Sequence, residues 1–272
     1  MISKPTRHIL SLSGGKDSAA LAIYMRDRVP EMEYIFHDTS KELPETYAYL
    51  ELLEAKLGRK ITRTTPDQSF EHWLVVYGGM IPSNHRRWCT KKLKLKPFEH
   101  YVGDDPVINY IGIRADENRG GYISHKPNIT PVYPFIEDGL VRRDIIRILE
   151  DSGLGLPKYT DWGRTRSGCF FCFYQQKIEW VRLKEKYPDM FEEAKRLEYV
   201  ANKGTGNPFY WSGDEPLVDL ERPERVEEIK RKWEESQEKA RKSPKSRLLL
   251  QILGTGDQDD EGEKEGCLIC HV

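Results

Sequence analysis

Short apolar runs alternate with helical stretches through the first 150 residues of this 272-residue chain. Four runs have strand character: Arg7–Leu12, Glu33–His37, Lys60–Thr65 and Val107–Ile113. Helices are expected over Ser18–Arg28 and over Glu45–Leu57, the second closed by Gly58 as a C-cap. This alternation predicts an α/β fold with an open, mostly parallel, doubly wound sheet. Ligands of such sheets bind at the carboxyl ends of the strands.

One of these junctions has the composition of an anion site. Residues 13–18 read Ser-Gly-Gly-Lys-Asp-Ser and lie directly between the first strand and the first helix. Two glycines let the backbone turn tightly and bring N–H groups against an anion. The helix N-terminus adds a partial positive charge and Lys16 adds a full one. The spacing differs from that of a Walker A loop, but the string predicts a phosphate-binding loop.

The charge balance limits the kind of partner the whole surface can take. Lys plus Arg number 43 and Asp plus Glu number 44, so any nucleic-acid surface must be local. No run approaches the roughly 18 apolar residues of a membrane span, and no secretory signal is visible at the N-terminus. Five cysteines are too few for a disulfide scaffold. We therefore expect a cytoplasmic protein, with no membrane partner, whose thiols bind metal or act in redox chemistry.

A local basic surface is present between residues 86 and 96. Six cations lie there without one acid: Arg86, Arg87, Lys91, Lys92, Lys94 and Lys96. The apolar Leu93, Leu95 and Phe98 indicate that one side of this stretch is buried. The cations are either a solvated face or a funnel for pyrophosphate, sulfate or the backbone of DNA or RNA. Trp88 either stacks on a base or packs in the core.

Several stretches, in order, resemble the motifs of the phosphoadenosine phosphosulfate (PAPS) reductase family. The glycine loop resembles the PP-loop of ATP pyrophosphatases with the adenine nucleotide alpha hydrolase-like fold. Residues 37–46 resemble the family's D-T-G-x-x-x-P-E-T segment, and residues 86–94 its R-x-x-C-C-x-x-R-K segment. Residues 111–119 resemble its G-x-R-x-x-E-S-x-R segment, and residues 131–135 the P-I-x-P segment that follows. The resemblance covers about residues 8 to 175.

The resemblance implies an adenine nucleotide, either ATP with Mg²⁺ or PAPS, lying over the loop. The phosphates would be held by Ser13, Gly14, Gly15, Lys16, Asp17 and Ser18. Asp38 and Thr39 would lie near the adenosine, or would simply form a turn. Arg114, and with it Arg119, would bind phosphate or sulfate, unless Arg114 pairs with a neighbouring acid at the surface. Lys16, Asp17, Cys89 and Arg114 are the expected catalytic residues.

The cysteines allow three arrangements. Cys89, Cys169 and Cys172 match three of the four cluster ligands of iron–sulfur members of the family, so a [4Fe-4S] cluster would need Cys267, Cys270 or another ligand besides. Alternatively, the pairs Cys169/Cys172 and Cys267/Cys270 form a structural Zn²⁺ site and Cys89 stays free. In the third arrangement the thiols are reduced or reversibly oxidised. The cluster is the interpretation we favour.

The expected organisation is a PP-loop nucleotide-binding α/β domain (1–175), a charged helical extension (176–253) and a flexible acidic tether with a terminal CxxC (254–272). Two long helices are expected in the extension, Gln176–Ala201 and Arg222–Lys242, as cover for the core or for partner docking.

Three functions are compatible with these features. The first is an ATP pyrophosphatase that adenylates an acceptor for sulfur transfer, similar to the ATP-pyrophosphatase component of DNA phosphorothioation systems, with DNA and a cysteine desulfurase as partners. The second is a PAPS or adenosine phosphosulfate reductase, which would release sulfite and use a thioredoxin-like partner. The third is a non-catalytic nucleotide- or nucleic-acid-binding module.

Overall fold

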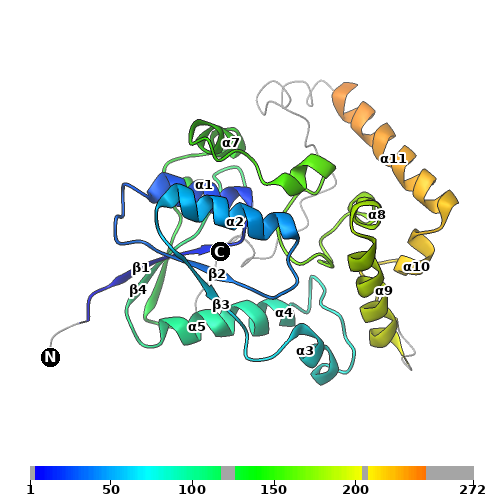
Figure 1. Cartoon of the computed structure of the whole chain (residues 1–272), viewed down its shortest axis with the longest axis horizontal. Coiled ribbons are helices and arrows are strands. Elements are labelled where there is room, and N and C mark those ends of the chain that lie inside the picture. Colours follow the sequence, from blue (N-terminus) through cyan, green and yellow to red (C-terminus); the bar gives the residue numbers. More distant parts are fainter. Residues whose placement is uncertain (1–3, 118–125, 204–207, 243–272) are drawn as a thin grey trace.

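A five-stranded parallel sheet forms the centre of the molecule in the computed structural model, which describes residues 4–117, 126–203 and 208–242 (Figure 1). Its strands follow the spatial order β3-β2-β1-β4-β5. Their bounds are β1 Arg7–Leu12, β2 Glu33–His37, β3 Ile61–Thr64, β4 Val107–Tyr110 and β5 Ile129–Val132. All four strand pairs are parallel, which confirms the predicted fold class.

Helices cover both faces of this sheet (Figure 1). One face carries α1 (Lys16–Met25), α2 (Pro44–Leu57) and α7 (Arg142–Asp151), which pack on strand residues such as Leu10 and Phe36. The other face carries a continuous helical stretch made of α4 (Trp88–Thr90), the π-helix η1 (Lys91–Leu95) and α5 (Lys96–Val102). Successive strand residues point to opposite faces, so Ile9 and Ile35 meet Phe98 of α5.

Several element boundaries differ from the sequence prediction. Helix α1 begins at Lys16, two residues before the predicted start, because the extended residue Gly15 is its N-cap. The predicted helix over Gln176–Ala201 is two helices, α8 (Lys177–Lys186) and α9 (Pro188–Asn202). Proline lacks an N–H and is favoured at a helix start, so Pro188 begins a new helix. Strand β4 ends at Tyr110 rather than Ile113, and β5 was not predicted as a strand.

The helices after residue 157 form a lobe beside the sheet (Figure 1). They are the 3₁₀-helix η2 (Lys158–Trp162), α8, α9, α10 (Leu217–Leu220) and α11 (Pro223–Lys242); the short helices α3 (Phe70–Val76) and α6 (Pro134–Glu137) precede them. In the ranges that the structure describes, no helix is long and apolar enough to span a membrane.

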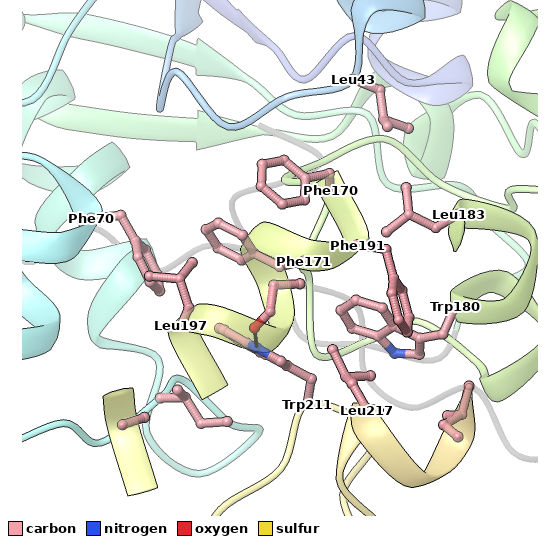
Figure 2. Close-up of a cluster of buried hydrophobic side chains, with 14 of the residues drawn as sticks. Leu43, Phe70, Phe170, Phe171, Trp180, Leu183, Phe191, Leu197, Trp211 and Leu217 are labelled. Carbon is pink, nitrogen blue, oxygen red and sulfur yellow. Dashed lines mark hydrogen bonds between the residues drawn. The ribbon is translucent and has the colours of Figure 1, made fainter. Parts of the chain in front are cut away.

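One aromatic core joins this lobe to the earlier part of the chain (Figure 2). Trp211 stacks on Phe171 with ring centroids 5.1 Å apart, and Phe171 lies 4.5 Å from Phe70. The Trp211 indole N–H donates to the backbone carbonyl of Ala194 at 3.0 Å. The core thus spans the predicted boundary at residues 175/176, while the division into domains stays a prediction. The predicted tether, 254–272, lies outside the described residues.

Candidate active site

The predicted phosphate loop lies between β1 and α1, where the sheet order reverses. Gly14 has φ +69°, and a Cβ on it would overlap the Thr46 methyl group of α2. A Cβ on Gly15 would lie 2.8 Å from the hydroxyl of Ser167. Both glycines are therefore required by close approach of other segments, and Gly14 also by its left-handed backbone.

The hydroxyl groups of Ser13 and Ser18 form hydrogen bonds within the loop. Ser13 N–H donates to Ser18 Oγ at 3.1 Å, and the two hydroxyl oxygens are 3.0 Å apart. Gly15 N–H donates to Ser13 Oγ at 3.2 Å. These bonds hold the turn so that the first backbone N–H groups of α1 face the carboxyl edge of the sheet, where an anion is favoured.

Asp17 and Arg114, both predicted as site residues, form a buried ion pair. Arg114 Nη1 lies 3.1 Å from Asp17 Oδ1 and 2.6 Å from Glu117 Oε1, and its Nε lies 2.9 Å from Asp116. Burial lowers the pKa of Arg114, but the three carboxylates outweigh burial and raise it. The alternative that Arg114 pairs with Asp116 or Glu117 is confirmed, but its placement at the surface is wrong: Arg114 is 9% exposed and joins the loop to the segment after β4. Arg119 lies outside the described residues.

Asp38 and Thr39, which follow β2, have different hydrogen-bond partners. Asp38 Oδ1 accepts hydrogen bonds from Ser40 N–H at 2.8 Å and from the Tyr47 hydroxyl at 2.7 Å, which fixes the turn. Burial raises the pKa of Tyr47, and the bond to Asp38 raises it further. Thr39 points instead toward a thiol, since its Oγ1 lies 3.3 Å from Cys169 Sγ.

Three cysteines, Cys89, Cys169 and Cys172, line one pocket, which we call the thiol pocket. It has a volume of about 470 Å³, counting the space open to solvent. Its other lining residues are mostly apolar or aromatic, namely Phe70, Pro82, Leu93, Phe171, Phe173, Tyr174 and Trp211; the polar exceptions are Thr39, Thr90 and Lys94. The structure thus brings the three cysteines expected as metal ligands to one pocket, while their role stays a prediction.

The thiol pocket disfavours charge at Cys169. Burial raises the pKa of the Cys169 thiol well above its ordinary value, and the nearby Glu42 raises it further. Cys169 Sγ lies 4.0 Å from Glu42 Oε1, which also accepts a hydrogen bond from Thr39 at 3.1 Å. Burial likewise raises the pKa of Glu42, an effect that Lys94 and Thr39 oppose. A neutral Cys169 thiol is thus the favoured form of this arrangement.

The three cysteine sulfurs are chemically suitable metal ligands, but they do not lie close enough together to hold one ion. Sulfur ligands in an apolar shell suit iron–sulfur clusters and zinc. Within the described ranges, however, no three His, Cys, Asp or Glu side chains come together closely enough to hold one ion. Cys267 and Cys270, which both metal arrangements were expected to draw on, lie outside the described residues. The cluster and the zinc site therefore stay predictions.

The basic stretch is partly surface and partly core. Lys91 and Lys96 are exposed, whereas Lys94 is 9% exposed and lines the thiol pocket. Trp88 is buried, its indole N–H donates to the Met80 carbonyl at 2.8 Å, and its ring stacks on Tyr77. Base stacking by Trp88 is therefore wrong, and the packing interpretation is confirmed.

Some neighbours of the site had no signal in the sequence. Ser167 Oγ donates to Ser13 Oγ at 3.4 Å across 154 residues of chain, and Tyr159 is fully buried beside α2. Glu42 forms an isolated antiparallel bridge with Cys169. Only the position of Ser167, two residues before the CxxC, could have drawn attention to it.

The parallel sheet and the glycine loop at its switch point define an open, doubly wound α/β fold with a candidate phosphate-binding loop. Residues 7–127 match the family model described as phosphoadenosine phosphosulfate reductase domain. The resemblance inferred from the motifs is thereby confirmed.

The known proteins similar to this chain differ in their described activities. An uncharacterized protein of Methanocaldococcus jannaschii is 27% identical over 228 residues, which are 78% of this chain and 45% of that protein. The tRNA-specific 2-thiouridylase MnmA of Actinobacillus pleuropneumoniae is 26% identical over 56% of this chain and 48% of its own length. The chain thus spans about half the length of these two relatives. The crystal structure of PAPS reductase from Candida auris, a phosphate complex, has a TM-score of 0.48 and 15% identity, covering 62% of this chain and 83% of that one.

Proposed function

We propose that this chain is a PP-loop ATP pyrophosphatase that activates an acceptor by adenylation so that sulfur can replace the activated oxygen. One observation carries the proposal: the CxxC turn is joined to the phosphate loop. Ser167 contacts Ser13 of the loop, and Cys169, two residues later, contacts Thr39 at the end of β2. These contacts support a phosphate site on the loop with the Cys169 thiol nearby, at the same edge of the sheet.

The chemistry needs two displacements. An acceptor oxygen attacks the α-phosphorus of ATP, and pyrophosphate leaves with the electrons of the broken P–O bond. The adenylated oxygen is then a good leaving group, and a sulfur nucleophile at the thiol pocket displaces AMP. The loop N–H groups and Lys16 offset the charge that develops on the phosphates, with Mg²⁺ as the expected counter-ion. Arg114 keeps Asp17, and with it the loop, in place.

The acceptor and the protein partners belong to the same proposal. The exposed Lys91 and Lys96 lie on the helical stretch that also forms part of the thiol pocket, which supports a DNA or RNA acceptor. The name of the MnmA relative, a tRNA-specific 2-thiouridylase, supports a nucleic acid as well. We propose a cysteine desulfurase as the sulfur source; its persulfide sulfur is reduced to the sulfide level by two thiols of the thiol pocket, which are oxidised to a disulfide, and an external thiol reductant restores them.

Replacing Lys16 by alanine is expected to lower pyrophosphate release from ATP by about 100-fold or more, because a preorganised charge at the phosphates is lost. Release is measured in a coupled phosphate assay, with and without DNA and RNA. Lys60→Ala, at an exposed position before β3, is the matched control and should keep full activity. Unchanged release by the Lys16 variant would contradict the proposed role of the loop.

The family model also supports a sulfonucleotide reductase as a second candidate. In that reaction a cysteine sulfur attacks the sulfate sulfur of PAPS, and a thioredoxin-like partner supplies the electrons that release sulfite. Sulfite from PAPS, without pyrophosphate from ATP, would favour this candidate.

We further propose that Cys89, Cys169 and Cys172 hold an iron–sulfur cluster, which would supply an iron able to bind sulfur. Protein purified without oxygen is expected to contain about four irons per chain, and Cys169→Ser should lower the iron content sharply. Iron and zinc are measured by plasma mass spectrometry beside the visible spectrum. One zinc per chain would favour the structural Cys₄ site instead, and no metal in either form would leave free thiols.

A further inference from the structure

Part of the candidate phosphate site is formed by residues that follow the region matching the family model. The matched region ends at residue 127, yet Ser167 lies over the loop. Its hydroxyl is 3.4 Å from Ser13 Oγ and 2.8 Å from the place a Cβ on Gly15 would take. Ser167 is only 6% exposed, so the contact is buried in the site.

Tyr159 of η2 belongs to the same part of the site. The side chain is fully buried, and its Oη makes no well-formed hydrogen bond among the described residues; a weak interaction with the Ser167 hydroxyl, which lowers the pKa of Tyr159, shows that the two side chains are neighbours. Burial raises the pKa of Tyr159, and Asp17 of the loop is among the charges that raise it further. A buried hydroxyl without a well-formed hydrogen bond destabilises a protein, so a bound group that accepts a hydrogen bond from it would relieve that cost.

Arg114 does not replace these hydroxyl groups as a hydrogen-bond donor to phosphate. Arg114 already faces three carboxylates, and it points at Asp17 rather than away from it. Thr46 of α2 adds another fully buried hydroxyl oxygen without a partner, beside Gly14 on the opposite side of the loop. Hydroxyl groups without a well-formed hydrogen bond thus occur on both sides of a turn whose backbone N–H groups favour an anion.

We propose that Tyr159 and Ser167 are phosphate-binding residues, whose hydroxyl groups donate hydrogen bonds to phosphate oxygens of a nucleotide on the loop. The ligand class, an adenine nucleotide, rests on the proposed function. Because Ser167 precedes Cys169 by two residues, the same contact positions the CxxC turn when phosphate is bound. Arg164, buried to 1% exposure, holds the other side of this turn by donating to the Cys169 carbonyl at 2.9 Å.

The test is calorimetric titration of the full chain with Mg-ATP and, separately, with inorganic pyrophosphate. Tyr159→Phe and Ser167→Ala should each raise the Kd about tenfold for both probes, as expected for a lost hydrogen bond to a charged group. Tyr199→Phe, on a side chain 71% exposed on α9, and Ser83→Ala are the matched controls and should bind like the wild type.

A thermal melt without ligand separates binding from structure. Tyr159→Phe removes only a hydroxyl that makes no well-formed hydrogen bond, so its melting temperature should equal or exceed that of the wild type. A lower melting temperature of Tyr159→Phe, or wild-type affinity in both variants, would overturn this inference and leave the proposed function standing. Failure of the wild type to bind either probe would overturn both.

Discussion

Arg114→Met is expected to lower the free energy of unfolding by about 3–5 kcal/mol, because it leaves buried carboxylates without their cation. The Asp17 and Glu117 side chains are 9% and 7% exposed, so water cannot replace the guanidinium. Methionine fills a similar volume, which makes lost charge rather than a cavity the main cause. Urea unfolding at neutral pH, followed by circular dichroism, measures the change.

An exposed ion pair provides the contrast. Arg26→Met removes a pair with Asp27 in which the two side chains are 39% and 81% exposed, and should change stability by no more than about 0.5 kcal/mol. If Arg114→Met were as mild as Arg26→Met, the ion pair between the loop and β4 would not stabilise the fold. Arg114→Lys, which keeps the charge but not the forked geometry, should fall between the two.

Gly14→Ala is expected to weaken ATP binding by about 100-fold or more while the remainder of the sheet stays folded. Alanine at φ +69° costs about 1 kcal/mol, and its methyl group would overlap the Thr46 methyl. The loop must therefore move, and its N–H groups lose their alignment on the phosphates. Calorimetric titration with Mg-ATP measures the loss.

A double variant tests the steric cause of this loss. Thr46→Ser removes the methyl group that the new side chain would meet and keeps the hydroxyl, so Gly14→Ala/Thr46→Ser should recover part of the affinity. Thr46→Ser alone is the control and should bind ATP nearly as the wild type does. No recovery in the double variant would show that backbone strain at residue 14, rather than the Thr46 contact, decides the loop's shape.

Local patterns predicted the sheet well, and the failures have physical causes. Strands β1 and β2 were predicted at their observed bounds because each is a buried apolar run. Strand β5 was not, since its four residues Ile129–Val132 include Thr130 and Pro131 and show no such run. The break between α8 and α9 was missed because the charged pattern continues through Pro188.

The site divides in the same way between local and distant contacts. The phosphate loop is contiguous, so its composition alone predicted it. Contacts such as Ser167 with Ser13, or Cys169 with Thr39, join residues 154 and 130 positions apart, and spacing cannot show them. The burial of Arg114 also depends on which carboxylates the fold brings to it. The sequence therefore could not decide between a buried position and a surface ion pair for Arg114.

The aromatic core shown in Figure 2 packs the C-terminal helices against residues that line the thiol pocket. Trp211 contributes to the wall of the thiol pocket and, through Phe171, to the packing between the lobe and α3. Shortening the chain before Trp211 would therefore remove part of the pocket wall as well as the helices that follow.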